Sequence, residues 1–286
     1  MRLNQNLASL NIYRNQVSNY RKQSSAIHNI SSGYKVNSAK DNPNDLAKSE
    51  NMRMQIRGLQ MASRNSQDGV SMLNTVDGAI DSVSSMLQRI RELTIQAGGA
   101  TGEDDRLAIQ EEIKQLTKGI DNAVNNCDFN GVKLIKNDEV IDNTSPTYIK
   151  MASGANFGET ISIPKYNFSS DMLGGTGTGE KIKDIDVTTE EGRNKALSSI
   201  DSAIETVNSA RSKYGALQNK FESLYNNIGS IEVSIQGAES SLRDADIAYE
   251  MVELARANIL IEAGNAMMVQ SNNFPKEVLR ILENMR

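Results

Sequence analysis

The sequence predicts a mainly α-helical protein: a long antiparallel helical hairpin or coiled-coil rod, formed by the N- and C-terminal segments, with a small β element in the middle. Apolar residues recur at steps of three and four in both halves of the chain, as they do on the packed face of a helix. The only prolines stand at positions 43, 146, 164 and 275, so each periodic segment lies in a stretch without this helix breaker. Both observations favour two long helical arms.

The N-terminal arm is expected to start with an amphipathic helix over residues 1–31, whose apolar stripe has no partner nearby in sequence. A polar loop follows, in which Asn42 is suited to cap the next helix and Pro43 to occupy its first position. An apolar repeat then predicts a helix that runs to about Gln96. The members of that repeat are Met52, Ile56, Leu59, Val70, Leu73, Val76, Ile80, Val83, Leu87, Ile90 and Ala97.

A shorter antiparallel helix is expected after the glycine-rich turn at residues 98–102, ending near Cys127. Thr101 and Asp104 have capping-box spacing at its start. The chain then changes character. The Asn130–Gly131 pair predicts a tight turn, and residues 148–151 and 160–163 have the composition or alternation of short strands.

The C-terminal arm is expected to be one long helix, because its apolar repeat runs from Leu197 to Val252. The glycine-rich segment 174–179 indicates a flexible loop before it, and Thr188 with Glu191 has capping-box spacing. Helical sequence continues over residues 254–286, where Pro275 is suited to open a short final segment.

Composition favours a thin bundle over a thick globular core. The chain has 38% hydrophobic and 5% aromatic residues, no Trp and a mean hydropathy of −0.47. A net charge of −5 argues against nucleic acid as a main partner. Residues 1–60 are rich in Lys and Arg, whereas residues 243–286 hold more Asp and Glu, so attraction between the two ends is expected.

The residues needed for catalysis or metal binding are scarce, so neither an enzyme nor a bound cofactor or metal is expected. Cys127 and His28 are the only cysteine and histidine, which excludes an internal disulfide and a paired-histidine zinc motif. Gly174 and Gly179 have the spacing of phosphate-loop glycines, but Glu180 stands where the phosphate-binding Lys is required. We expect Cys127 to be a structural thiol.

No apolar run approaches the ~20 residues of a membrane span, so membrane insertion is not expected. The first ten residues also lack the apolar stretch of a secretory signal. Export, if it occurs, is therefore expected without a cleaved signal peptide.

Several ordered segments resemble bacterial flagellin, among them GALQNKFES at residues 215–223. The others are residues 3–11, 30–41, 55–59, 62–65, 87–93, 129–133, 154–161, 241–246 and 256–260. The resemblance covers both ends and most of the middle. It implies a structural subunit that self-assembles into the extracellular bacterial flagellar filament used for swimming, with terminal helices that order on polymerisation to form the tube core.

The same resemblance divides the chain into five segments. They are the N-terminal filament-core helix and loop (1–42), the N-terminal helices of the rod domain (43–128), the β element and short loop (129–187), the C-terminal long helix of the rod domain (188–240) and the C-terminal filament-core helix (241–286). Large variable outer domains of the family lie between the β element and the last rod helix. Here Ser169 to Asp186 passes almost directly between them, which implies a short form.

Site residues and partners follow from the resemblance and the apolar stripes. The expected filament-core residues are Leu3, Leu7, Leu10, Val17, Ile27, Tyr249, Val252, Ile259 and Val269. A surface that matches the one read by a Toll-like innate receptor is expected at Gln88, Arg89, Leu93 and Glu112. The implied partners are other copies of the chain, a flagellar export chaperone, filament cap and hook-junction proteins, and that receptor of a host.

Three other interpretations remain open from the sequence. A hook–filament junction protein is similar at both ends and differs in not elongating into long filaments. An enzyme carried on a flagellin scaffold would need catalytic residues that the chain lacks at motif level. A generic helical scaffold or secreted translocator would not depend on its terminal segments for assembly.

Overall fold

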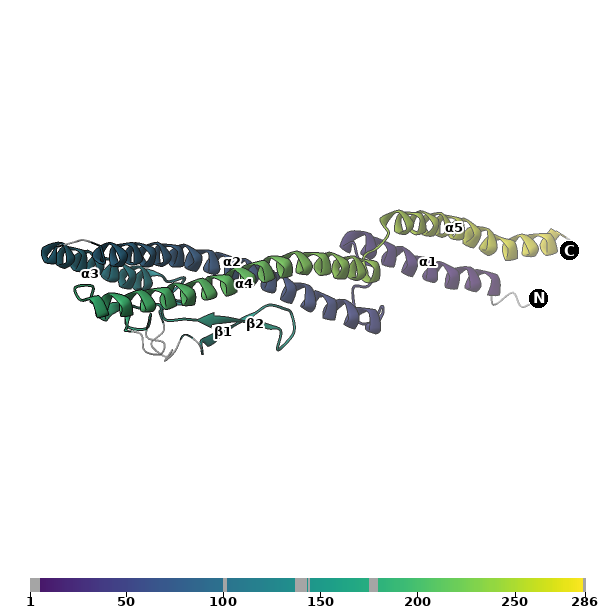
Figure 1. The fold of residues 1–286 in the computed structure, drawn as a ribbon. Coiled ribbons are helices and arrows are strands. Elements are labelled where there is room, and N and C mark those ends of the chain that lie inside the picture. Colours follow the sequence, from purple (N-terminus) through teal and green to yellow (C-terminus); the bar gives the residue numbers. More distant parts are fainter. Residues whose placement is uncertain (1–5, 100–101, 137–142, 144, 175–179, 285–286) are drawn as a thin grey trace. The chain divides into compact units, whose positions relative to one another are not determined.

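The computed structural model of this 286-residue chain describes residues 6–99, 102–136, 143, 145–174 and 180–284. Its helices are α1 (Leu7–Ser32), α2 (Pro43–Ala97), α3 (Glu103–Asn126), α4 (Glu190–Arg243) and α5 (Ile247–Asn284), as Figure 1 shows. The strands are β1 (Thr147–Ala152) and β2 (Thr160–Lys165), and a short 3₁₀ turn, η1, covers Ile182–Asp184. The predicted mainly α-helical fold with a small β element is confirmed.

The chain divides into two compact units, which we describe separately. The terminal unit contains Met1–Met54 and Val233–Arg286, and the central unit contains Gln55–Glu232. The helices α2 and α4 contribute to both units. In the described part of the chain, no helix is sufficiently long and apolar to cross a membrane.

The central unit is built around a heptad seam on α4. Its buried residues fall into two rows with a spacing of seven, which is the repeat of coiled-coil packing. One row is Ile200, Val207, Tyr214, Phe221 and Ile228, and the other begins with Ala196, Ala203 and Ala210. The small alanine side chains allow the neighbouring helix to approach closely, while the larger row fills the space beside them.

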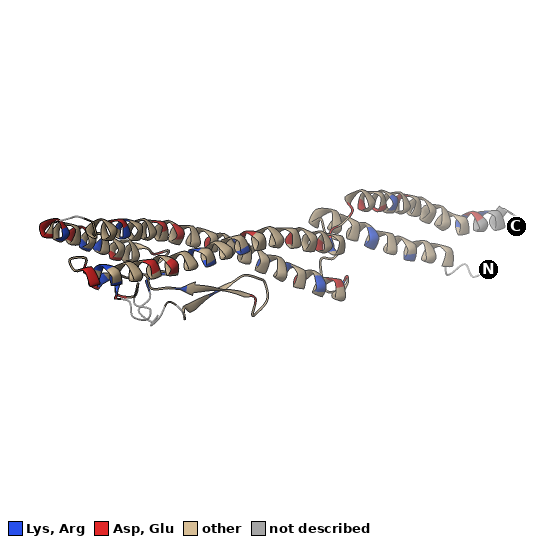
Figure 2. Ribbon diagram, viewed as in Figure 1, with Lys and Arg blue, Asp and Glu red and all other residues tan. Residues whose placement is uncertain are grey.

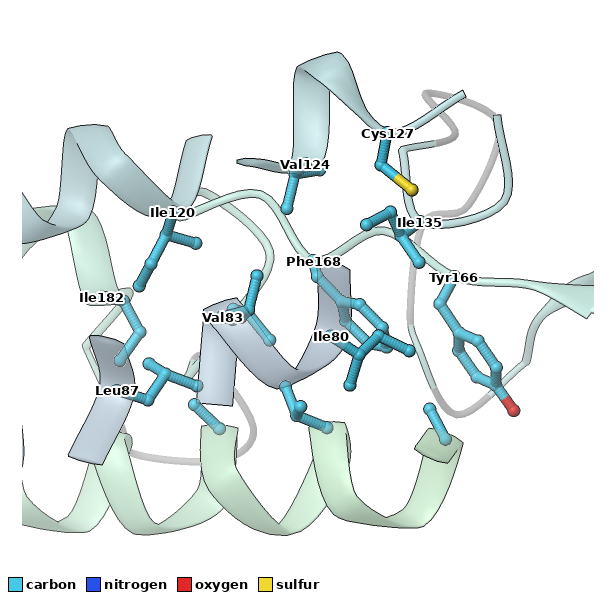
Figure 3. Close-up of a cluster of buried hydrophobic side chains, with 14 of the residues drawn as sticks. Ile80, Val83, Leu87, Ile120, Val124, Cys127, Ile135, Tyr166, Phe168 and Ile182 are labelled. Atoms are coloured by element: carbon cyan, nitrogen blue, oxygen red, sulfur yellow. The ribbon is translucent and has the colours of Figure 1, made fainter. Parts of the chain in front are cut away.

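Helix α2 runs antiparallel to α4 along the central unit. Arg91 on α2 pairs with Asp201 at 2.7 Å, and Asn74 accepts a hydrogen bond from Gln218 at 3.0 Å. Lower numbers on one helix thus face higher numbers on the other. Figure 3 shows Ile80, Val83 and Leu87 of α2 in a cluster with Ile120 and Val124 of α3, together with side chains of the connecting segments.

The two strands form a hairpin that packs against α2. Ile149 pairs with Ile163 in the antiparallel register, and Ile163 is fully buried. At the tip, a Cβ atom on Gly58 of α2 would lie only 2.9 Å from the Cβ of Ala155. Glycine at this position therefore permits the close approach of the hairpin.

The Asn130–Gly131 turn is confirmed, because both residues have positive φ, 50° and 77°, between the bridged residues Phe129 and Val132. The start of α2 is also as predicted. The Asn42 side-chain oxygen accepts hydrogen bonds from the N–H groups of Asn44 and Asp45, and Pro43 is the first helical residue.

Two predicted caps are displaced by one residue. Thr101 lies outside the described residues, and Gly102 is the residue that precedes α3, with its N–H bonded to the Asp105 carboxylate at 3.3 Å. At the start of α4, Thr189 and not Thr188 accepts the Gly192 N–H at 3.1 Å.

The expected single helix from Leu197 to Val252 is wrong, because α4 ends at Arg243 and α5 begins at Ile247. The end of α4 pairs with the loop after α1: Lys35 N–H donates to the Arg243 carbonyl, and Ala245 N–H donates to the Gly33 carbonyl. The Asp246 carboxylate then caps α5. These partners replace the helical hydrogen bonds that the break removes.

The final segment also differs from expectation. Pro275 lies inside α5 and does not open a separate helix.

Candidate subunit interface

The terminal unit brings α1 and α5 side by side (Figure 1). Many of the large apolar side chains of these two helices are exposed. The predicted core residues among them are 44–66% exposed. These are Leu7, Leu10, Ile27, Tyr249, Val252, Ile259 and Val269. Val17 is partly buried, and Leu3 lies outside the described residues. The structure therefore places most of the predicted set on an outer surface, which we call the apolar face.

Other large side chains extend this apolar face. Tyr13 and Tyr20 belong to the same sequence stripe as Leu10 and are about half exposed. On α5 the extension comprises Met251, Leu260, Met267 and Phe274. The repeat of three and four did not single out these α5 residues, because apolar residues lie on more than one side of that helix.

A groove of about 580 Å³ lies between the N-terminal part of α1 and the C-terminal half of α5. Ala8 and Ile12 of α1 line one wall, and Met267, Val269 and Phe274 of α5 line the other. A soluble single chain rarely exposes so many large apolar side chains on one pair of helices without a partner. The groove and the apolar face together have the character of a protein interface.

Few apolar side chains of α1 and α5 are fully buried. Among the side chains that the structure describes, these are Ala26, Ala257 and Ile261, while Ile12, Val17, Ile30, Leu254 and Met268 are half-buried. Gln16 is buried as well and bonds to Asn265. Burial of a large apolar side chain contributes about 1.5–3 kcal/mol, so this seam stabilises the helix pair weakly compared with what the apolar face could contribute.

Charge does not join α1 to α5 directly. The charged side chains of α1 are Lys and Arg, and this helix contains no Asp or Glu. Helix α5 carries both basic and acidic side chains, as Figure 2 shows. Among the described residues, no ion pair links the two helices, and their polar contacts are hydrogen bonds of side-chain amides. Within the described part of the chain, its two ends are joined by one ion pair outside these two helices, Glu50 with Arg243, whose signs are the reverse of the excess charge on each end.

An arginine at the end of α4 secures the break before α5. Arg243 pairs with Glu50 at 2.8 Å, and its guanidinium lies 4.9 Å from the centre of the Tyr34 ring. The hydrogen bond from Arg243 lowers the pKa of the Glu50 carboxyl below its usual value. We call Tyr34, Glu50 and Arg243, with the backbone bonds described above, the joint.

The predicted receptor surface is only partly exposed. Gln88 and Arg89 on α2 and Glu112 on α3 are exposed, and Arg89 pairs with Glu112 at 3.0 Å. The hydrogen bond to Glu112 raises the pKa of Arg89. The expectation that Leu93 belongs to this surface is corrected by the structure, because its side chain is 1% exposed and lies in the buried core of the central unit. Ile90, three residues earlier on the same helix, is buried in the same core.

The structure supports a packing role for Cys127. Its thiol is buried among core residues, and burial raises its pKa, which makes it a poor nucleophile. The described residues contain no group of three or more His, Cys, Asp or Glu side chains that could hold a metal ion. Asn143 and Asn167 lie together, with the Asn143 side chain donating to the Asn167 carbonyl at 2.8 Å.

Comparison with known proteins identifies the family. The bacterial flagellin N-terminal helical region matches residues 3–139, and the bacterial flagellin C-terminal helical region matches residues 197–282. The chain is 38% identical over 303 aligned residues to flagellin of Bacillus subtilis, covering 99% of this chain and 100% of that protein. Flagellin of Halalkalibacterium halodurans is 38% identical over 283 residues, with coverage of 99% and 100%.

A solved structure supports the fold alone. A putative flagellar hook-associated protein from Vibrio parahaemolyticus superposes with a TM-score of 0.60 at 16% identity, covering 71% of this chain and 100% of that one. Both flagellin helical regions and the full-length relatives agree with the short form inferred from the direct passage at residues 169–186. The chain belongs to the bacterial flagellin family.

Proposed function

We propose that the apolar face of α1 and α5 is the surface through which this structural subunit packs against other copies in the extracellular flagellar filament. The observation that carries the proposal is the exposure of large apolar side chains on both helices, while Ile261 is the one large apolar side chain that is fully buried in the described part of these helices. A contact between different surfaces on successive copies extends into a helical polymer when its rotation does not close a ring. Assembly then buries the apolar face.

The terminal helices are weakly stable in a lone subunit under this proposal. Their seam buries few large side chains, and isolated helices of this length depend on tertiary packing for most of their stability. Neighbouring copies supply that packing. Order in α1 and α5 is therefore coupled to incorporation into the filament. The similarity to full-length flagellins favours this role over that of a hook–filament junction protein.

Substitution on the apolar face tests the proposal. Val252→Ser combined with Ile259→Ser removes two exposed side chains of α5 without opening a cavity within the unit. Seeded growth of filaments, followed by electron microscopy, should slow by roughly tenfold or more, since each side chain contributes about 1.5–3 kcal/mol when fully buried.

Arg256→Ser combined with Glu262→Ser is the matched control on the same helix. Both residues are exposed, and an exposed ion pair such as that of Arg256 with Glu253 contributes little. Growth of the control should stay close to that of the unchanged chain. Equal growth of the apolar double variant would contradict the proposal.

The same surface suits the other filament proteins. Before assembly, an export chaperone would cover the apolar face of α5, and at the filament ends the cap and hook-junction proteins would occupy the positions of missing copies. Export without a cleaved signal peptide belongs to this proposal. No catalytic role is needed for any of these steps.

The exposed cluster of Gln88, Arg89 and Glu112 remains the proposed surface for a Toll-like innate receptor. Arg89→Ala should weaken binding of the purified receptor to the unpolymerised chain. Arg91→Ala is the matched control, because Arg91 is on the same helix and forms a similar exposed ion pair with Asp201. Equal binding by both variants would remove Arg89 from the surface.

A further inference from the structure

The exposed side of α1 carries a short sequence repeat. Residues 13–16 read YRNQ, and residues 20–23 read YRKQ. Residues seven apart lie on nearly the same side of a helix, so each residue type of the repeat forms a row of its own. The two tyrosines are about half exposed, and both arginines are exposed. We call Tyr13, Arg14, Tyr20 and Arg21 the tyrosine–arginine stripe.

The arginines of the stripe point away from α5 of their own chain. The glutamines that end the two repeats, Gln16 and Gln23, donate hydrogen bonds to side chains of α5. Each arginine stands two residues before its glutamine, which is about 200° around a helix of 3.6 residues per turn. In the described part of the chain, neither arginine forms an ion pair. An anionic partner for the stripe therefore has to come from another molecule.

Assembly as proposed above would remove these arginines from water. Leu10, Arg14, Val17 and Arg21 follow one another at steps of four, three and four, so they share one side of α1. A neighbour that covers Leu10 on the apolar face also covers Arg14. A guanidinium that loses water without a carboxylate beside it costs a large free energy. The covering surface therefore has to supply an anion as well as apolar contact.

The groove between α1 and α5 is a surface of this kind. Among the described residues that line it, Glu277 is the one charged side chain, and it is exposed. Met267, Val269 and Phe274 supply apolar walls, which suit the tyrosine rings of the stripe. Its volume of about 580 Å³ lies within the range of pockets that enclose a drug-sized ligand, so several side chains of a neighbour can enter it.

The other carboxylates among the described side chains of α5 are less suitable partners. Glu250 already accepts a hydrogen bond from Asn29 at 2.9 Å, and Glu253 pairs with Arg256 at 3.4 Å. Glu262 is exposed but does not line the groove. Glu277 alone combines a carboxylate with apolar walls that are large enough to cover a tyrosine.

We infer that the tyrosine–arginine stripe of one copy occupies the groove of the next copy and pairs an arginine with Glu277. The inference rests on the proposed function, because the groove exists only where α1 and α5 are ordered against each other. Stripe and groove are different surfaces of the same helix pair. Each copy thus offers its stripe to one neighbour and its groove to another, as a contact that extends a polymer requires.

Opposite charge reversals in two separate full-length chains test whether the contact joins copies. The stripe variant carries Arg14→Glu with Arg21→Glu, and the groove variant carries Glu277→Lys. Either variant alone sets like charges against each other, so its seeded growth, followed by electron microscopy, should fall by roughly tenfold or more. An equal mixture of the two should recover most of the lost growth, because every stripe then finds a groove of opposite charge.

Glu262→Lys is the matched control for the groove variant, because it reverses an exposed carboxylate of α5 outside the groove. This control should grow like the unchanged chain. Mass spectrometry of sedimented filaments measures how much of the stripe variant enters each mixture. The stripe variant should enter several-fold more when mixed with Glu277→Lys than when mixed with Glu262→Lys. An equal share in the two mixtures would overturn the inference.

The mixture also separates pairing between copies from pairing within one chain. No recovery in the mixture would overturn the inference, and growth of a single chain that carries all three substitutions would then place the pairing within one chain. Normal growth of the separate variants would overturn it too. In that case Val252→Ser with Ile259→Ser decides the proposed function: slow growth of that variant retains it, and normal growth removes it.

Discussion

Gly58 shows how a single missing side chain positions the β hairpin on α2. Gly58→Val should destabilise the central unit, because the new Cβ would overlap Ala155, 2.9 Å away. Gly78→Ala, on the same helix with open space around it, should instead stabilise the chain by up to about 1 kcal/mol through helix propensity. Urea unfolding followed by circular dichroism measures both. A Gly58→Val variant at least as stable as the unchanged chain would contradict the close packing.

Tyr214 depends on a hydrogen bond that no apolar substitute supplies. Its side chain is fully buried, and its hydroxyl donates to the Pro164 carbonyl at 2.9 Å. Burial also raises the pKa of the phenol, so the group stays neutral in the folded chain. Tyr214→Phe should lower the free energy of unfolding by about 1–3 kcal/mol, because a buried carbonyl loses its donor.

The control for Tyr214 is Tyr225→Phe on the same helix. Tyr225 is 40% exposed, so its hydroxyl can exchange a protein partner for water. The urea midpoint of the control should stay within the range of ordinary surface substitutions, about ±0.5 kcal/mol. Equal effects of the two substitutions would show that the Tyr214 hydroxyl contributes nothing specific.

At the scale of elements, locally encoded features were predictable from the sequence. The start of α2 follows from Asn42 and Pro43, whose effects on a helix are local, and the turn follows from Asn130 and Gly131. The heptad rows of α4 follow from apolar periodicity. These features need no information about which distant segment lies nearby.

Features set by distant partners were not predictable in the same way. The break after Arg243 depends on the Gly33–Lys35 segment, so the continuous apolar repeat of residues 197–252 concealed it. Leu93 was placed on a surface by the family resemblance, and matching positions in a sequence do not show which side chains the neighbouring helices cover. The hydrogen bonds between side-chain amides of α1 and α5 were missed because polar side chains do not contribute to an apolar repeat.

The joint between α4 and α5 should be sensitive to acid. The hydrogen bond from Arg243 lowers the pKa of Glu50 in the folded chain, relative to the usual value of 4.5. The associated stability is therefore complete above pH 4.5 and is lost as the pH falls through the lower folded-state pKa. The loss is reversed when the pH returns to neutral, so it has to be measured while the chain is at acidic pH.

Hydrogen exchange at several acidic pH values, corrected for the intrinsic rate, provides that measurement. The backbone amides of Lys35 and Ala245, which bond across the joint, should lose protection as Glu50 becomes protonated. Glu50→Gln should reduce this pH dependence, because glutamine carries no titrating charge. A pH dependence that is the same in both chains would exclude Glu50 as its source.

At the scale of the whole molecule, the two units differ in where their apolar residues lie. The central unit buries its large side chains within the chain, including Leu73, Leu87 and Phe221. The terminal unit leaves comparable side chains exposed, including Leu7, Val252 and Val269. Since apolar burial is the dominant favourable term in folding, the central unit should be stable alone and the terminal unit should require other copies.

Hydrogen exchange of α1 and α5 in the unpolymerised chain and in the filament tests this difference most directly. In the unpolymerised chain, the amides of both helices should exchange much faster than those of α2 within Gln55–Ala97, and in the filament they should become protected. Protection of α1 and α5 in dilute unpolymerised chain equal to that of α2, with no gain on polymerisation, would contradict the account.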